Sequence, residues 1–237
     1  MIKAILFDSG NVLNYPTSGN WFISPHFYDF VNQQRFQGIS RPKIHHAFQR
    51  ASQYINGIPT ILDKSEELAF FTEFYRILFS CLPELEIDKN KLKRIAEDLV
   101  YTPQKYTFFS DALAVIPILS KKCKLGIVSD AWPSILDVYE NAGLLKYFST
   151  FIISSVLGTH KPDRIMYEAA LKELEITPAE AIFIDDNPVN CKGAKKAGIA
   201  SYLLCRNPGK APFLKLQGKL GGYQIIDSLN TLTDFLA

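Results

Sequence analysis

The feature that most constrains the fold is an alternation of short apolar runs and helical patterns, which begins near residue 104. Such an alternation is typical of a parallel sheet built from strand–helix–strand units. The predicted strands are Leu125–Val128, Phe151–Ile153, Ala181–Ile184, Tyr202–Leu204 and Gln224–Ile226. The apolar run Ile2–Phe7 predicts a first strand of the same kind. We therefore predict an α/β fold with a Rossmann-like, three-layer core and a parallel sheet.

Capping residues and helix breakers predict helices between most of these strands. Proline favours the first turn of a helix and disrupts its interior, whereas glycine favours the position after its end. The predicted helices run from Ser110 to about Lys122 with a kink at Pro117, from Pro133 to Gly143, from Lys161 to Leu174, and from the cap Asn187 through Pro188 to Gly198. In the third of these, Ile165, Ala169 and Leu174 are the predicted inward positions.

Residues 16–103 differ in character, because they show a strong helical rhythm and no convincing strand. We predict that they form an all-helical cap domain inserted into a core of residues 1–15 and 104–237. Its predicted features are an apolar face at Phe27, Phe30, Val31 and Gln34, a second at Ile44, Ala47, Phe48, Ala51 and Ile55, a capping box of Asp63 and Glu66, a helix start at Asp88, and a bundle core with Phe70, Phe71 and Phe74. The segment Arg206–Leu220, rich in Gly, Pro and Lys, predicts a long mobile loop.

Composition narrows the class of protein. The chain has 237 residues, of which 47% are hydrophobic, and a net charge of +2, which predicts a soluble globular protein. The charge is too small to favour nucleic acid or an anionic membrane as partner. No signal-type or membrane-spanning segment is recognisable, so a cytoplasmic location is expected. The four cysteines lack the spacing of a zinc site and are expected to be reduced thiols, and nothing indicates the oligomeric state.

Polar residues follow three of the predicted strands. Asp8 follows the first apolar run, Ser129 and Asp130 follow the strand at 125–128, and Asp185 and Asp186 follow the strand at 181–184. In addition, Lys161 lies at a predicted helix start and Asn190 lies one turn beyond the acidic pair. Each residue alone could be a turn, a cap or a solvated side chain.

Together these residues match the requirements of phosphoryl transfer to a carboxylate. That reaction needs a nucleophile, a hard cation that screens the repulsion between two anions, and donors around the phosphate oxygens. Two carboxylates and a backbone carbonyl suit Mg²⁺, which prefers oxygen ligands in octahedral geometry.

Four motifs occur in this order along the chain: Asp8, Ser129, Lys161 and the pair Asp185–Asp186. With them the chain resembles the haloacid dehalogenase superfamily, specifically its phosphatase-like members with a helical cap inserted after the first motif. The resemblance implies that Asp8 is the nucleophile and forms a phosphoaspartyl intermediate, and that Lys161 neutralises Asp8 and the phosphate. It implies phosphate binding by Ser129 and the Asp130 backbone amide. The implied substrate is a small phosphorylated metabolite, with sugar phosphates among the candidates.

The resemblance also implies a metal site. Mg²⁺ would be bound by Asp8, by the backbone carbonyl of Gly10 and by Asp186. Asp185 and Asn190 would hold these ligands in position without binding the metal themselves.

The sequence departs from the family at three positions. Gly10 stands where most phosphatases of the superfamily carry a second Asp, the acid and base of the reaction. Asn11 replaces the usual Gly, and Asp130 stands where Asn is common. The absence of a carboxylate at Gly10 argues against a phosphomutase, which needs that acid and base to transfer phosphate between two hydroxyl groups. It predicts a phosphatase that favours leaving groups needing little protonation, or one that uses water or a cap residue as acid.

Three alternatives remain open. A phosphonate hydrolase would need a cap lysine for a Schiff base, and Lys43, Lys64 and Lys91 are available. A dehalogenase would not need a metal, so the pair Asp185–Asp186 weighs against it. The chain could also be a binding or regulatory protein that retains the site without turnover.

The cap is expected to close over the site. Its hinges are expected near Tyr15–Pro16 and Thr102–Pro103. Trp21 and Arg35 are candidates for contact with the substrate, although each also has an ordinary structural explanation.

Overall fold

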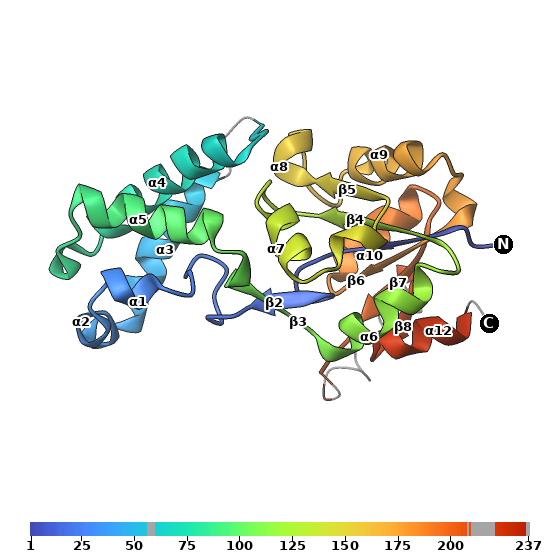
Figure 1. The fold of residues 1–237 in the computed structure, drawn as a ribbon, viewed down its shortest axis with the longest axis horizontal. Coiled ribbons are helices and arrows are strands. Elements are labelled where there is room, and N and C mark those ends of the chain that lie inside the picture. Colours follow the sequence, from blue (N-terminus) through green and yellow to red (C-terminus); the bar gives the residue numbers. More distant parts are fainter. Residues whose placement is uncertain (56–59, 208, 210–220, 236–237) are drawn as a thin grey trace. The chain divides into compact units, whose positions relative to one another are not determined.

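The computed structural model describes residues 1–55, 60–207, 209 and 221–235, and it divides into two compact units (Figure 1). The first, here called the α/β unit, contains Met1–Tyr15, Thr107–Trp132 and Tyr139–Ala237. The second, here called the helical unit, contains Pro16–Tyr106 and Pro133–Val138. The predicted insertion, 16–103, differs from the helical unit by residues 104–106 and 133–138.

The α/β unit is built on a six-stranded sheet in which the strand order is β5-β4-β1-β6-β7-β8. Its strands are β1 (Ala4–Phe7), β4 (Lys124–Ser129), β5 (Thr150–Ile153), β6 (Ala181–Asp185), β7 (Ala200–Leu204) and β8 (Gln224–Ile226). All neighbours pair in parallel. The α/β fold and the six predicted strands are therefore confirmed, with bounds that agree within two residues. All four residues of β1 are buried, as expected for a central strand of a parallel sheet.

The order of the strands creates a topological switch point between β1 and β6. From β1 the chain proceeds to β4 and β5 on one side, and it then returns to β6 on the other side. Phe7 pairs with both Ile127 and Ile184, so β1, β4 and β6 end at nearly the same level. Ligands of open α/β sheets bind outside the carboxyl ends of the strands at such a point.

Helices α9 (Arg164–Leu174) and α10 (Pro188–Lys196) pack on the sheet: α9 contacts β4 and β5, and α10 contacts β6 and β7. Leu6, Val128 and Phe183 belong to the apolar core beneath them. The described part of this unit also contains α6 (Ser110–Leu119), α8 (Ser154–Leu157) and α12 (Leu232–Phe235). Helix α7 (Ile135–Asn141) has residues 135–138 in the helical unit and residues 139–141 in the α/β unit.

The helix predictions need several corrections. α9 begins at Arg164 rather than Lys161, because the Asp163 carboxylate accepts a hydrogen bond from the Ile165 amide and caps the helix there. Ile165 therefore lies in the first turn and is 51% exposed, so its prediction as an inward residue was wrong, whereas Leu174 is buried.

In α6, Pro117 lies inside the helix, which ends at Leu119 rather than Lys122, and Ser110 is its first residue rather than its cap. α7 is shorter than predicted at both ends. α10 is as predicted, with Asn187 accepting from the Val189 amide and Gly198 at a φ of +87°.

The helical unit contains α1 (Phe27–Phe30), α2 (Gln33–Gly38), α3 (Arg41–Ile55), α4 (Lys64–Ser80) and α5 (Lys89–Tyr101), in which α4 packs against α3 and α5. Phe70, Phe71 and Phe74 are buried between them, as predicted. The single helical face predicted at 27–34 is instead two short helices, because the Asn32 side chain caps α2 by accepting from the Arg35 amide.

The predicted helix starts at Asp63 and Asp88 are confirmed as capping carboxylates. The predicted box is incomplete, because Glu66 Oε2 accepts from the Leu62 amide, one residue before Asp63.

Two strands were not predicted. β2 (Asn14–Pro16) and β3 (Tyr106–Phe108) form a separate two-stranded sheet. Each has three residues, which is too short for an alternating pattern to be recognised.

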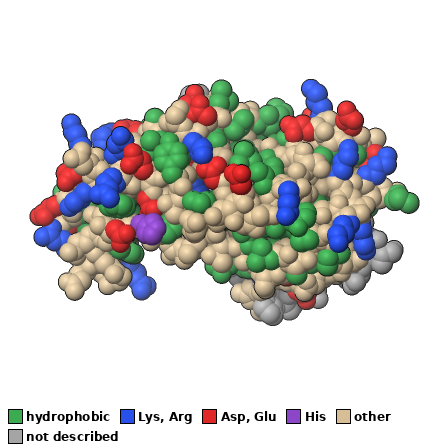
Figure 2. Space-filling view, in the orientation of Figure 1, with side chains coloured by type: hydrophobic (Ala, Val, Ile, Leu, Met, Phe, Trp, Pro, Cys, Tyr) green, Lys and Arg blue, Asp and Glu red, His purple; other side chains and the backbone are tan. Residues whose placement is uncertain are grey.

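Other expectations concern the surface and the cysteines. All four cysteines are free thiols. None of the described helices combines the length and the apolar character that crossing a membrane requires. The face drawn in Figure 2 carries basic, acidic and hydrophobic side chains. Except for Arg206, Asn207 and Gly209, the predicted loop Arg206–Leu220 lies outside the described residues.

Candidate active site

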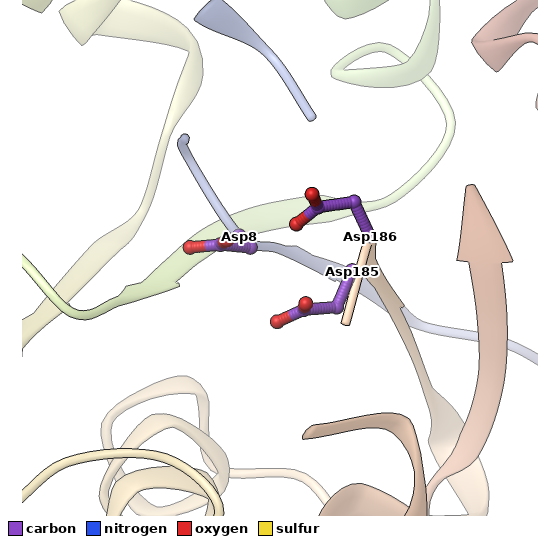
Figure 3. Close-up of side chains that lie close together, drawn as sticks. All are labelled: Asp8, Asp185 and Asp186. Atoms are coloured by element: carbon purple, nitrogen blue, oxygen red, sulfur yellow. The ribbon is translucent and has the colours of Figure 1, made fainter. Parts of the chain in front are cut away.

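Three carboxylates converge at the switch point of the sheet (Figure 3). Asp8 follows β1, Asp185 ends β6 and Asp186 follows it. One oxygen of each lies within 4.8 Å of the others, and they form a group that could hold a metal ion. Figure 3 shows the three carboxylates pointing to the same side. Asp185 is fully buried and Asp186 is exposed.

Lys161 supplies the positive charge of the site. Its Nζ lies 2.7 Å from Asp8 Oδ1 and 2.9 Å from Asp185 Oδ2, and the residue is 4% exposed. Burial alone would lower the pKa of Lys161, but the carboxylates of Asp8, Asp185 and Asp130 raise it above its ordinary value. The ammonium therefore stays protonated at neutral pH.

Ser129, the last residue of β4, donates a hydrogen bond from Oγ to Asp8 Oδ1 at 2.7 Å. The Ser9 amide donates to the same oxygen at 2.7 Å. Together with Lys161, three donors therefore converge on Oδ1. This arrangement fixes the rotation of the Asp8 carboxylate, because hydrogen bonds to a charged acceptor are strong.

The Asp130 side chain positions the loop that carries Lys161. Its Oδ1 accepts a hydrogen bond from the Lys161 backbone amide at 2.9 Å. An asparagine could accept this bond through its amide oxygen, so the presence of Asp at a position where Asn is common preserves the contact.

Asp185 has both oxygens occupied by protein donors. Lys161 Nζ and Asn190 Nδ2 (3.0 Å) donate to Oδ2, and the Asn187 amide (2.7 Å) donates to Oδ1. Burial, and then the nearby Asp8 carboxylate, raise the pKa of Asp185 above its ordinary value. Asn190 is itself fixed, because its backbone carbonyl accepts a hydrogen bond from the Tyr167 hydroxyl at 2.8 Å. The structure thus brings Asn190 to the acidic pair.

Gly10 and Asn11 lie in a tight turn after Asp8. The amides of Leu13 and Asn14 both donate to the Ser9 carbonyl, at 2.8 and 3.1 Å, and Asn11 adopts a φ of +58°. That conformation favours glycine and is tolerated by asparagine better than by most residues, which explains why Asn is accommodated at this position. Burial and the Asp8 carboxylate raise the pKa of Asp186, and the neighbouring Asn11 side chain acts against them, a proximity that no sequence pattern predicts.

A second group of contacts that was not predicted surrounds the Ser9 side chain, next to Asp8. Ser9 Oγ lies 2.8 Å from the Tyr139 hydroxyl and accepts from Asn14 Nδ2 at 2.7 Å. All three residues are at most 1% exposed. The Ser9 hydroxyl is therefore engaged inside the protein and does not replace the acid that Gly10 lacks.

The three lysines considered for a Schiff base lie in the helical unit. Lys43 pairs with Glu84 at 2.6 Å and Lys64 with Asp137 at 2.7 Å, and a Schiff base would first require the loss of a proton from the lysine. Hydrogen bonding to Asp137 raises the pKa of Lys64. Lys91 is exposed on α5.

The two candidates for substrate contact have partners of their own. Arg35 pairs with Glu86 at 2.5 Å and, with Lys43, lines a cavity of about 480 Å³. The Trp21 ring contacts Tyr106 edge-on.

The charges of the site fit a divalent cation. The Lys161 ammonium pairs with Asp8 and Asp185, and Asp186 belongs to the same acidic group, so among the described residues of the site the carboxylates outnumber the ammonium before any anionic substrate arrives. The donors are all oxygens, as Mg²⁺ prefers. Asp185 is committed to protein donors, so Asp8 and Asp186 are the carboxylates best suited to direct coordination.

Comparison with known proteins identifies a family of hydrolases. A family model described as haloacid dehalogenase-like hydrolase matches residues 2–198. A putative pyrophosphatase of Clostridium perfringens is 32% identical over 38% of the chain and 43% of its own length, and a phosphoserine phosphatase of Thermus thermophilus is 25% identical over 60% of each. The chain thus spans less than two thirds of these two relatives.

A longer match and a solved structure extend the comparison. A glyceraldehyde 3-phosphate phosphatase of Methanopyrus kandleri is 26% identical over 87% of the chain and 85% of its length. L-2-haloacid dehalogenase from Xanthobacter autotrophicus aligns with 99% of the chain and 98% of its own, at a TM-score of 0.67 and 20% identity. At that identity the structural similarity supports the fold alone.

Proposed function

This chain belongs to the haloacid dehalogenase-like hydrolases, and we propose that it is a Mg²⁺-dependent phosphatase that hydrolyses a small phosphomonoester through a phosphoaspartyl intermediate on Asp8. The observation that carries this proposal is the convergence on Asp8 Oδ1 of Ser129 Oγ and Lys161 Nζ, each at 2.7 Å, beside Asp186. The names of three relatives, all phosphatases or a pyrophosphatase, support a phosphate ester as substrate.

In the first step, an oxygen of Asp8 attacks phosphorus and the bond from phosphorus to the ester oxygen breaks. The leaving oxygen takes a proton and departs as an alcohol. In the second step, water attacks the phosphorus of the aspartyl phosphate, which releases inorganic phosphate and restores Asp8. No oxidant, reductant or further reactant is needed.

Lys161 offsets the charge of Asp8 and of the phosphate in both steps. The Ser129 hydroxyl and the Asp130 backbone amide would donate to phosphate oxygens once the phosphate is bound. Asp185 orients Lys161 through their ion pair. Asn190 in turn holds Asp185, so both act by positioning.

Asp8, Asp186 and the backbone carbonyl of Gly10 would hold Mg²⁺. The bound ion would offset the repulsion between the carboxylate and the phosphate. A dehalogenase has no such repulsion to overcome, so the acidic surplus at this site favours a phosphate substrate.

The first step has no obvious acid in the α/β unit as described. Gly10 has no side chain, and the Ser9 hydroxyl is held by Tyr139 and Asn14. We therefore propose that the enzyme favours leaving groups that need little protonation, or that it uses water or a residue of the helical unit as acid.

The test is release of inorganic phosphate from a panel of aryl and alkyl phosphates, with Mg²⁺ and with EDTA. The expected result is turnover that EDTA abolishes and that Asp8→Asn lowers by at least about 10⁴-fold. Asp227→Asn is the matched control, because Asp227 also directly follows a strand of the α/β unit but is exposed at the far edge of the sheet.

Other outcomes would select the alternatives. Turnover that survives Asp8→Asn would end the nucleophile assignment. Chloride release from 2-chloropropionate in EDTA would identify a dehalogenase, and inactivation by borohydride with a carbonyl-containing phosphonate would identify a phosphonate hydrolase. Mg²⁺ binding without turnover of any of these substrates would favour a regulatory protein.

A further inference from the structure

Arg206 joins three segments of the α/β unit that are far apart in sequence. It lies just beyond β7, and its Nη1 and Nη2 donate to the two oxygens of Asp111 at 3.0 and 2.9 Å. Nη2 also donates to the Val12 carbonyl at 2.7 Å. The guanidinium lies 3.7 Å from the centre of the Phe109 ring, so both its plane and its position are fixed.

Asp111 is held from its other side. Its Oδ2 accepts from the Leu229 amide at 3.0 Å and from Ser228 Oγ at 3.3 Å. Burial alone would raise the pKa of Asp111, but the hydrogen bonds from Arg206 and Leu229 lower it below its ordinary value. The carboxylate is therefore charged at neutral pH and forms a rigid support for Arg206.

Val12 belongs to the turn that carries Gly10 and Asn11. It is fully buried, and its carbonyl is the point at which Arg206 contacts this turn. Asn11 adopts the left-handed conformation in the same turn. This conformation is less favourable for asparagine than for glycine, and the hydrogen bond from Arg206 to Val12 is one constraint that holds the turn in it.

We propose that Arg206, supported by Asp111, is a positioning residue for metal binding. It fixes the turn from Ser9 to Asn14, and with it the Asn11 side chain near Asp186 and the Gly10 carbonyl that the proposed function assigns to Mg²⁺. The inference rests on the proposed function, because it takes Mg²⁺ as the ion at this site. The sequence suggested a mobile loop beginning at Arg206; the structure shows that this residue is fixed.

Only arginine suits this position. Its planar group binds the Asp111 carboxylate with two parallel bonds while the same Nη2 reaches the Val12 carbonyl. Lysine has a single nitrogen on a flexible chain and does not reproduce the two-pronged contact. Arg206→Lys should therefore restore only part of what Arg206→Met removes.

The test is calorimetric titration of Mg²⁺ into the full-length, metal-free protein. Arg206→Met should weaken Mg²⁺ binding about tenfold, the lower end of the effect of residues that support metal ligands, and Arg206→Lys should fall between it and wild type. Arg76→Met is the control, because Arg76 also pairs with a carboxylate, that of Glu73, but is exposed in the helical unit. Its affinity should stay within twofold of wild type.

A second comparison tests the route through Asn11. Asn11→Gly keeps the backbone conformation and removes the contact with Asp186. If Arg206 acts through Asn11, the double variant Arg206→Met/Asn11→Gly should bind Mg²⁺ more tightly than the product of the two single effects predicts. Additive effects would overturn this route.

The outcomes separate this inference from the proposed function. A lower melting temperature for Arg206→Met with unchanged Mg²⁺ affinity would show a structural role only and overturn the inference. If Arg206→Met does not fold, Asp111→Leu removes the support instead, and unchanged affinity in that folded variant would equally overturn it. Failure of the wild type to hydrolyse any ester would instead count against the proposed function, while the titrations would still decide the role of Arg206.

Discussion

The ammonium of Lys161 lies 2.9 Å from Asp185 Oδ2, and neither side chain is more than 1% exposed. This ion pair joins the segment before α9 to the end of β6. A buried pair is weak support for stability as such, because the cost of removing both charges from water offsets their attraction. Its consequence here is positional, since the same Nζ is held 2.7 Å from Asp8.

Lys161→Met should destabilise the protein as well as abolish activity. Removal of one partner leaves buried negative charge without compensation, which typically costs about 3–5 kcal/mol. Added Mg²⁺ should recover more stability in this variant than in wild type, because the ion would offset part of that charge. Urea unfolding with and without Mg²⁺ measures both effects. The control is Lys172→Met, an exposed lysine of α9, the helix that follows Lys161, and equal unfolding free energies for the two variants would contradict the prediction.

Gly193→Ala should damage the site from a distance. A Cβ at this position of α10 would lie 2.7 Å from Pro162 Cβ, 2.8 Å from the Tyr167 hydroxyl and 2.9 Å from the Pro162 carbonyl. Pro162 would have to move, and Lys161 precedes it. We expect a loss of about 1–3 kcal/mol in unfolding free energy, together with a lower kcat.

Gly38→Ala is the matched control for that substitution, because nothing lies within 4 Å of a Cβ built at Gly38 in α2. It should leave stability unchanged or raise it by about 0.4–1 kcal/mol. Thermal unfolding and phosphate release measure the two variants, and wild-type behaviour of Gly193→Ala would show that α10 can shift without cost.

A pH-dependent term in stability should come from Lys105 in the helical unit. This lysine is 5% exposed and donates to Ser134 Oγ at 2.6 Å, which in turn donates to Glu67. Burial lowers the pKa of Lys105 from 10.5 to about 8, against the opposing effect of Glu67. Between these two pH values the unfolded chain binds more protons than the folded one, so stability should rise with pH.

The size of this rise should be about 2–3 kcal/mol between pH 8 and 10.5. Denaturant unfolding of wild type and Lys105→Met across this range measures it, because tyrosines that titrate in both proteins cancel in the difference. The wild type should gain stability relative to the variant as the pH increases. Parallel curves would show that Lys105 keeps its ordinary pKa in the folded protein.

The sequence made the position of the main residues of the candidate site predictable, because each follows a local pattern. Asp8, Ser129 and Asp185 end or follow apolar runs, and parallel strands bring their carboxyl ends to one edge. The proximity of Asn11 to Asp186 and the hydrogen bonds of Ser9 with Tyr139 and of Arg206 with Val12 follow no such pattern. They depend on how distant segments pack.

The errors in the predicted fold have two different causes. Ile165 has the spacing of an inward residue, but the cap at Asp163 sets where the helix begins and so which side faces solvent. Residues 133–138 follow a strand of the core in sequence, yet they pack with the helical unit, where Ser134 bonds to Glu67 and Lys105. A partner 67 residues away cannot be inferred from periodicity.

Gly10→Asp should supply the acid that the wild type lacks. Gly10 does not adopt a positive φ, so its backbone conformation does not exclude a larger residue. The wild-type kcat/KM should fall steeply as the pKa of the leaving alcohol rises from aryl to alkyl phosphates. General acid catalysis is typically worth about 10²–10⁴-fold, so Gly10→Asp should raise the rate for alkyl phosphates by at least about 10²-fold and flatten this dependence. Gly10→Asn, which has the same shape without an ionisable proton, should do neither. A flat dependence already in the wild type would mean that another residue serves as the acid, and the helical unit would then be the place to seek it.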